Sequence, residues 1–151
     1  MSKRGGKDIH QDSRGFAGVP RTIMDSADYK SLTGNAVKLL LDFAYQYKGD
    51  KAKNNGDLSC AYSVLSKRGF NSKSTLQRCK KELLDRDLIR ETRKGVSGVG
   101  GKRLCSLYAV TWGVLYEQYY PDGIPKHGKA GTNRPLRNTW STELITNDKK
   151  K

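Results

Sequence analysis

The sequence is poor in several residue types that mark common protein classes. Its 151 residues include three cysteines, two methionines and two tryptophans, and only 35% are hydrophobic. Globular domains usually reach about 45–50%, a figure that also counts glycine, so part of the chain is expected to stay outside a packed core. No apolar run approaches the roughly 18 residues of a membrane span, and none follows the basic start as in a secretory signal. We therefore expect no membrane segment and no leader.

Cysteine and histidine are too few and too scattered to form a recognisable site. The cysteines, Cys60, Cys79 and Cys105, are odd in number and far apart, which suits neither a disulfide framework nor paired metal ligands. His10 and His127 lie near the two ends, where we expect solvated side chains. The sequence thus predicts a cytoplasmic protein without a metal or a cofactor.

Acidic residues are also scarce, at 15 Asp and Glu against 29 Lys and Arg. No cluster of carboxylates suggests two-metal chemistry. The stretch GVSGVGGK lacks the G-x-x-x-x-G-K-[ST] register, and β-prone sequence rather than a helix follows it, so it does not predict a phosphate-binding loop. We do not expect an enzyme.

What the chain does have is a net charge of +14, and a surplus of this size points to a polyanionic partner. The charge is concentrated: residues 67–103 contain twelve basic and four acidic residues, whereas residues 15–66 contain six and five. Most of the remaining surplus lies in residues 1–14 and 121–151. The alternative, a generally soluble surface, does not account for this concentration.

Composition divides the chain into three parts. Residues 1–15 are polar and glycine-rich and predict a flexible basic arm. Residues 16–120 have the length and periodicity of one folded domain. Residues 121–151 predict a basic tail without stable structure, which contains a small apolar island, Trp140, Leu144 and Ile145.

Apolar residues at three- and four-residue spacing predict three helices in the domain. The first follows Thr33 as its N-cap and ends at Gly49, and its inward residues are Val37, Leu40, Leu41, Ala44 and Tyr47. The second covers residues 58–67 and is closed by Gly69. The third is capped by Asn71 or Ser72 and runs to about Asp87, with the apolar stripe Leu76, Cys79, Leu83 and Leu84.

A β-hairpin is predicted after the third helix. Residues 88–93 are β-prone, residues 94–103 form a glycine-rich basic loop, and residues 104–112 alternate apolar and polar positions. The order helix, helix, tight turn, helix, strand, loop, strand is that of a winged helix-turn-helix. We therefore predict a mainly α fold with a β-hairpin wing.

The third helix of this arrangement would be the recognition helix. Ser74, Gln77 and Arg78 lie near its N-terminal end, on the side away from the apolar stripe. Arg can bind guanine and Gln can bind adenine in a major groove, so these three residues are the predicted base contacts. The predicted phosphate contacts are Lys67, Arg68, Ser72, Lys73 and Lys81 around the helix, and Arg93, Lys94, Lys102 and Arg103 in the wing. An ordinary solvated helix face is the alternative, and the excess of one sign of charge argues against it.

The run NNGDLSCAYSVLSKRGFNSKSTLQRCKKELLDRDLIRETRKG, followed by SLYAVTW, carries a resemblance to a known family. Its motifs, which lie within residues 54–112, are N-N-G-D-L-S, R-G-F-x-S, T-L, E-L-L, L-I, T-R and S-L-Y-A-V-T-W, and the match covers roughly residues 16–116. These resemble small winged helix-turn-helix DNA-binding proteins of bacterial plasmids and other mobile elements. The resemblance implies a winged helix and DNA binding.

The expectation is a sequence-specific duplex DNA-binding protein of a mobile element, acting as a transcriptional regulator or in replication or partition. Aromatic residues are not interleaved with the basic stretch, which favours a duplex over a single strand. Two alternatives stay open: an interaction protein of a phage or plasmid that binds host nucleic-acid machinery, such as a CRISPR inhibitor, and an RNA binder. The chain could also form a homodimer through the tyrosine-rich end of the domain (Tyr116, Tyr119 and Tyr120) or the Trp140 island.

Overall fold

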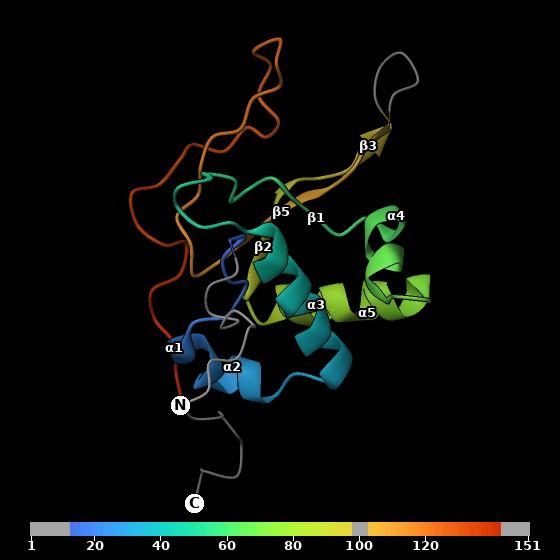
Figure 1. Cartoon of the computed structure of the whole chain (residues 1–151), viewed down its shortest axis with the longest axis vertical. Coiled ribbons are helices and arrows are strands. Elements are labelled where there is room, and N and C mark those ends of the chain that lie inside the picture. Colours follow the sequence, from blue (N-terminus) through green and yellow to red (C-terminus); the bar gives the residue numbers. More distant parts are fainter. Residues whose placement is uncertain (1–12, 98–102, 143–151) are drawn as a thin grey trace, which may run out of the picture.

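The computed structural model describes residues 13–97 and 103–142, and this part of the chain has a mixed α/β fold (Figure 1). It contains five α-helices, a 3-10 helix and five short strands. The helical elements are α1 (Arg21–Met24), α2 (Ala27–Lys30), α3 (Gly34–Gln46), α4 (Tyr62–Leu65), η2 (Ser66–Arg68) and α5 (Lys73–Asp85). The strands are β1 (Leu58–Ser59), β2 (Ile89–Arg93), β3 (Val96–Ser97), β4 (Arg103–Leu104) and β5 (Leu107–Val110).

The two long helices, α3 and α5, begin at side-chain caps that the sequence predicts. Thr33 accepts a hydrogen bond from the Ala36 amide at 3.4 Å, and Ser72 accepts one from the Thr75 amide at 3.3 Å. These bonds satisfy backbone donors that would otherwise have no partner in the first helical turn. Glu82 on α5 also accepts hydrogen bonds from the amide and hydroxyl of Thr33, so the start of α3 is fixed against α5.

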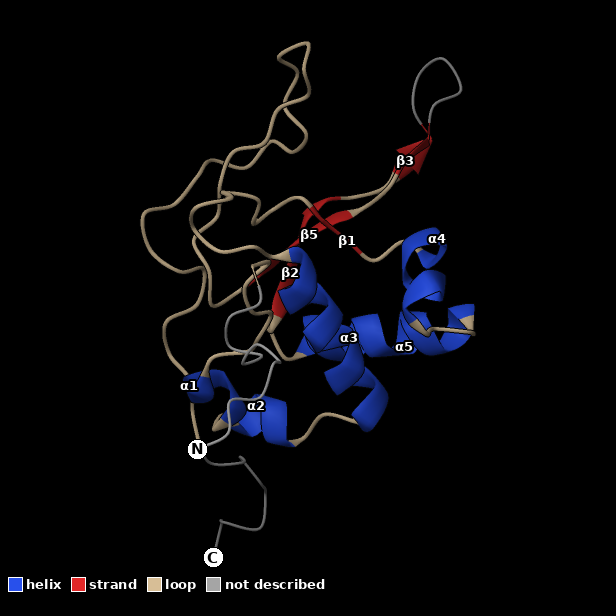
Figure 2. Cartoon of the chain, in the orientation of Figure 1, coloured by secondary structure: helices blue, strands red, loops and turns tan. Residues whose placement is uncertain are grey.

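The main core lies between α3, α5 and one face of the sheet. Strand β5 is central, with antiparallel neighbours β1 and β2, and the helices gather on one side of it (Figure 2). The fully buried side chains of this core include Leu39, Leu40, Phe43, Leu76, Leu83, Tyr108 and Val110. Burial of each large apolar side chain contributes about 1.5–3 kcal/mol, and this packing fixes the orientation of α5.

The tight turn before α5 depends on a glycine. Gly69 has φ +101°, in the left-handed region that favours glycine. A Cβ placed there would also lie only 2.4 Å from Nζ of Lys38. The turn therefore reverses the chain between η2 and α5 in a way that other residues would strain.

The predicted hairpin is present, and its two arms extend beyond the pairing of β2 with β5. Strand β2 pairs with β5, with a register shift between Glu91 and Arg93, and the two arms continue as the β3–β4 pair. The tip, residues 98–102, lies outside the described residues. In Figure 1 the β3 end of the hairpin and the α4–α5 unit project toward the same side of the molecule.

Several predicted boundaries differ from the structure. Residues 58–67 are not one helix, because Leu58 and Ser59 pair with β5 and only Tyr62–Leu65 is α-helical. Because β1 pairs with β5, the sheet has three strands rather than the two of the predicted hairpin. Helix α3 buries Ala36, Leu39 and Phe43, whereas Leu41, predicted to be inward, is 49% exposed. All four residues of β5 are buried, so that strand is covered on both faces rather than alternating.

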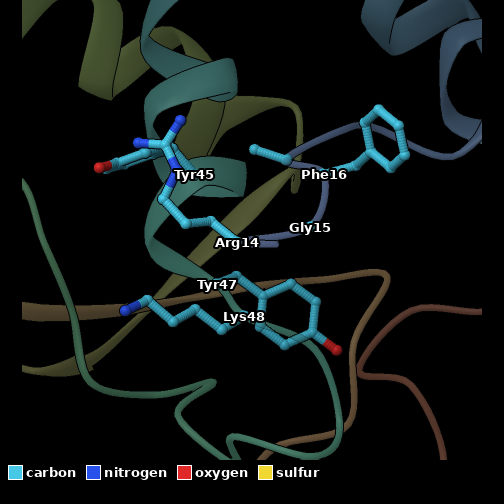
Figure 3. Close-up of a pocket in the computed structure, with 7 residues that line it drawn as sticks. Arg14, Gly15, Phe16, Tyr45, Tyr47 and Lys48 are labelled. Carbon is cyan, nitrogen blue, oxygen red and sulfur yellow. The ribbon is translucent and has the colours of Figure 1, made fainter. Parts of the chain in front are cut away.

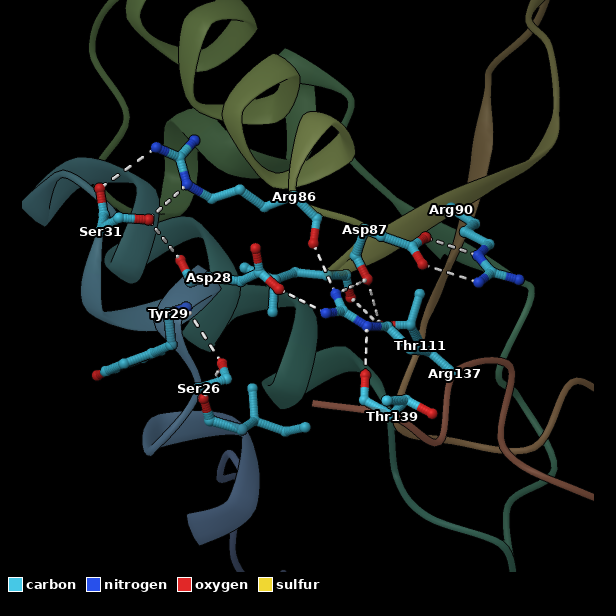
Figure 4. A network of polar contacts seen from close by, with 12 residues as sticks. Ser26, Asp28, Tyr29, Ser31, Arg86, Asp87, Arg90, Thr111, Arg137 and Thr139 are labelled. Atoms are coloured by element: carbon cyan, nitrogen blue, oxygen red, sulfur yellow. Dashed lines mark hydrogen bonds and ion pairs between the residues drawn. The ribbon is translucent and has the colours of Figure 1, made fainter. Parts of the chain in front are cut away.

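The segment 121–142, which we name the C-terminal strap, contains no helix or strand but is bonded to the body along its length. Lys126 forms an ion pair with Asp57 at 2.8 Å, and the buried His127 lies 3.1 Å from the Tyr116 carbonyl oxygen. Arg137 donates to the Arg86 carbonyl at 2.8 Å and pairs with the Asp28 carboxylate (Figure 4). These contacts differ from the expectation of a tail without stable structure.

Trp140 belongs to the same set of contacts. Its ring is partly buried against the core, and the Arg137 guanidinium lies 3.9 Å from the ring centroid. The Trp140 ring of the expected island therefore packs partly on its own chain. Leu144 and Ile145 lie outside the described residues.

Candidate nucleic-acid interface

The outer face of α5 carries the predicted base contacts. We define this face as the exposed residues Lys73, Ser74, Gln77, Arg78 and Lys81. Leu76, Cys79 and Leu83 of the same helix are buried, so packing of the apolar stripe holds the outer face toward solvent. Gln77 and Arg78 have no hydrogen-bond partner among the described residues. Both side chains are thus available to a ligand.

Other members of the outer face already have local partners. Ser74 shares a hydrogen bond of 2.9 Å with Ser72, whose hydroxyl also caps the helix. Lys81 pairs with Asp85 one turn along at 2.8 Å, and Nζ of Lys73 lies 5.5 Å from the Tyr62 ring centroid. These exposed contacts are weak, so a strong anion could replace them.

A hollow of about 200 Å³ lies at the N-terminal end of α5, lined by Asn35, Lys38, Gly69, Phe70, Asn71, Ser72 and Thr75. Lys38 donates to the Gly69 carbonyl at 3.1 Å and lies 5.1 Å from the Phe70 ring centroid. Lys38 was not among the residues predicted from the sequence, because it is on α3, 31 positions before Gly69. Only the packing of α3 against α5 brings this cation to the turn.

A second hollow, of about 170 Å³, separates α5 from the base of the hairpin. Its lining includes Gln77 and Lys80 from α5, and Ser106 and Tyr108 from the hairpin. Nζ of Lys80 lies 5.9 Å from the Tyr108 ring centroid. Burial raises the pKa of Tyr108 although Lys80 and Ser106 oppose the rise, so the phenol stays protonated and can donate. Lys80 was also not predicted from the sequence. It lies at the side of α5 that faces the hairpin.

Arg68, a predicted phosphate contact, is partly exposed but has partners within the fold. Its Nε donates to the Asp42 carboxylate at 2.9 Å, and its guanidinium lies 3.9 Å from the Tyr45 ring centroid. The Asp42 side chain is only 9% exposed, and a buried carboxylate needs such a partner. Arg68 therefore connects the turn to α3, and Lys67 beside it is exposed and without a partner among the described residues.

Arg93 likewise has partners within the fold, at the base of the hairpin. Its guanidinium donates to the Cys105 carbonyl at 2.8 and 3.0 Å, to the Tyr120 hydroxyl at 2.6 Å and to the Lys126 carbonyl at 3.2 Å. The neighbouring Lys94 is exposed. Lys102 lies outside the described residues, and of Arg103 only the backbone is described.

Other chemistries gain no support from the described residues. Within residues 13–97 and 103–142, no three His, Cys, Asp or Glu side chains come together as metal ligands would. Burial raises the pKa of Cys60 to about 12, which keeps this thiol protonated and unreactive. None of the described helices is long and apolar enough to cross a bilayer.

Comparisons of the chain with protein-family models, with curated proteins and with solved structures gave no match. The resemblance to plasmid-borne winged-helix proteins therefore stays a prediction from the motifs.

Proposed function

We propose that the protein binds duplex DNA in a sequence-specific way, using α5 as a recognition helix and the hairpin as a wing. The observation that carries the proposal is the outer face of α5, which presents Gln77 and Arg78 to solvent without partners in the described chain. Both side chains have groups that match base edges in a major groove. The helix precedes a hairpin that projects to the same side (Figure 1), which is the order of elements in a winged helix-turn-helix.

The distribution of charge supports the same orientation of α5 toward DNA. Lys67 lies in η2 just before the turn, Lys73 begins α5, and Lys94 lies in the hairpin. Lys38 and Lys80 add positive charge at the two hollows beside the helix. Cations spaced around a helix can bind the two phosphate backbones that border a groove, and such contacts position the helix without reading sequence. Sequence would be read by Arg78, Gln77 and Ser74.

The test begins by selecting bound duplexes from a random pool, followed by fluorescence anisotropy with the selected and a scrambled duplex. Arg78→Ala should weaken binding to the selected duplex by about 1–3 kcal/mol and change binding to the scrambled duplex much less. The matched control is Arg21→Ala, which removes the same charge from an exposed position on α1. Equal losses on the two duplexes would remove Arg78 from base recognition.

The same assay separates the alternatives. Selection that yields no motif would overturn sequence-specific binding, and a duplex RNA that competes as well as the selected DNA would overturn the choice of DNA. A symmetric motif with two half-sites would indicate a dimer on the DNA. The choice between a regulator and a replication or partition factor follows from where that motif lies relative to the gene.

A further inference from the structure

A further cavity lies away from α5, at the C-terminal end of α3. It has a volume of about 640 Å³ and is lined by Arg14, Gly15, Phe16, Ala17, Tyr45, Tyr47 and Lys48 (Figure 3). Sites for small ligands usually measure about 300–1,000 Å³. The cavity is thus large enough to hold one small organic molecule.

The lining combines aromatic rings and cations and contains no acidic residue. Tyr45 and Phe16 are 52% and 68% exposed, which is unusual for large rings that could pack in a core. In Figure 3 the side chains of Arg14 and Lys48 extend toward the same end of the cavity, whereas the rings of Phe16 and Tyr47 extend toward the other. A ligand that is flat and apolar at one end and anionic at the other fits this division.

Two tyrosines line this cavity, and their rings have different surroundings. Tyr47 donates to Asp50 at 3.2 Å, and burial together with Asp50 raises its pKa to about 12, so the ring carries no charge. The Arg68 guanidinium lies 3.9 Å from the Tyr45 ring centroid. The Arg68 guanidinium thus covers one face of the Tyr45 ring, so the rings of Phe16 and Tyr47 are the ones that can stack on a ligand.

We propose that this cavity binds a nucleotide, with the base stacked on an aromatic ring and the phosphate beside Lys48 and Arg14. Stacking on aromatic rings and attraction by cations are the two interactions by which proteins hold unpaired nucleotides without reading sequence. The nucleotide can be a free mononucleotide or a residue of a single strand, because both have the same chemistry. The proposal is independent of duplex binding by α5.

The experiment is a calorimetric titration of the full chain with AMP, adenosine, inorganic phosphate and a single-stranded dA hexamer. AMP should saturate one site, with an affinity at least about fivefold above adenosine or phosphate, because only AMP uses both ends of the cavity. A hexamer that binds much more tightly than AMP identifies a single strand as the source, and equal affinity identifies the free nucleotide. The proposal is overturned if neither AMP nor the hexamer saturates a site.

Variants locate the site. Phe16→Leu should lower AMP affinity at least about fivefold, whereas Tyr119→Leu, at an aromatic residue that is 53% exposed elsewhere, should not. Lys48→Gln should lower it and make it less sensitive to salt, whereas Lys51→Gln in the following loop should not. Equal losses in each variant and its control would overturn the assignment. Arg78→Ala should leave AMP binding unchanged while it weakens duplex binding, so the two proposals can fail separately.

Discussion

The outer face of α5 and the C-terminal strap both contain basic residues, yet the two regions use them in opposite ways. On α5, Arg78 is exposed and has no partner in the described chain. In the strap, Arg137 contacts Asp28, the Arg86 carbonyl and the Trp140 ring, and its side chain is only 18% exposed. Two arginines with the same charge thus differ in whether another molecule can reach them.

This difference changes the meaning of the basic stretch at residues 67–103. Arg68 and Arg93 count toward its surplus, but both bind groups within the fold, as Arg137 does. Among the described residues of this stretch, the exposed cations without an acidic partner are Lys67, Lys73, Arg78 and Lys94. Arginine suits the internal positions because its planar guanidinium can donate several hydrogen bonds in fixed directions, whereas a lysine is a mobile point charge. Local net charge therefore indicates a region, and the partners of each side chain decide which residues can bind a ligand.

The largest effect expected from this comparison is on stability, from Arg137→Ala. The substitution leaves Asp28 and the Arg86 carbonyl without their partner and removes the stack on Trp140 (Figure 4). Loss of one member of a mostly buried pair costs about 3–5 kcal/mol. We expect about 2–4 kcal/mol in urea unfolding, because both side chains keep some contact with water.

The matched control is Arg134→Ala, at an exposed arginine three residues earlier in the strap. It should change the free energy of unfolding by less than about 0.5 kcal/mol. At a temperature where both variants are folded, DNA affinity should stay close to that of the parent. A selective loss of DNA affinity in Arg137→Ala would place the strap in the interface and break the comparison.

The next largest effects are expected from substituting two neighbouring residues in the hairpin, Arg93 and Lys94. Arg93→Ala removes hydrogen bonds to Cys105, Tyr120 and Lys126 and should destabilise the protein by about 1.5–3 kcal/mol. Lys94→Ala should leave stability nearly unchanged and reduce the salt dependence of DNA binding by about one phosphate contact. Urea unfolding measures the change in stability, and fluorescence anisotropy at several salt concentrations measures the salt dependence of DNA binding. An unchanged slope for Lys94→Ala would remove this part of the wing from the interface.

The sequence predicts the parts of this fold that depend on regular periodicity. The long helices α3 and α5, their caps at Thr33 and Ser72, and the hairpin all follow local patterns. Strand β1 does not, because its two residues are held by distant groups: Gln46 on α3 donates to the Ser59 carbonyl at 2.8 Å and accepts from the Ser59 amide at 2.7 Å. Tertiary contacts of this kind override a local helical pattern.

The difference between local patterns and tertiary contacts also explains which features of the candidate interface the sequence predicts. Exposure of Gln77 and Arg78 follows from helical spacing. The engagement of Arg68 by Asp42 joins residues 26 positions apart, and that of Arg93 by Tyr120 joins residues 27 positions apart. No local pattern signals such pairs. The strap is the extreme case, since its side chains bond mostly to backbone groups and leave no periodic trace.

A smaller effect is expected from the titration of His127 in the strap. Burial lowers its pKa below the usual 6.5, although the hydrogen bond with the Tyr116 carbonyl opposes this shift. The Lys129 amide donates to Nδ1 of the ring, which fits a neutral imidazole. The unfolded chain then binds more protons than the folded one as the pH falls below about 6.5. The stability contributed by this ring is therefore complete above that pH and decreases as the pH falls toward the folded pKa.

The measurement is the free energy of unfolding between pH 5 and pH 8 for the parent and His127→Gln. Gln stays neutral throughout, so the variant should lose the part of the pH dependence that lies just below pH 6.5. The pKa of the nearby Glu117 is lowered as well, but its contribution is lost only at lower pH, below the usual range of a carboxyl group. Identical pH profiles for the two proteins would show that the ring is not held neutral.

The smallest effect concerns the one cation of the α5 face that has an acidic partner, Lys81. Its pair with Asp85 joins side chains that are 75% and 58% exposed, and such pairs contribute only about 0.3–0.5 kcal/mol. Asp85→Asn should therefore change stability by less than about 0.5 kcal/mol. It should nevertheless strengthen DNA binding at low salt by about twofold to fivefold, because it removes a negative charge near the phosphates and makes Lys81 available to them. Lys81→Ala should act in the opposite direction by a similar factor. If both variants bind DNA as the parent does, the C-terminal half of α5 lies outside the interface, and only the first two turns of the helix enter the groove.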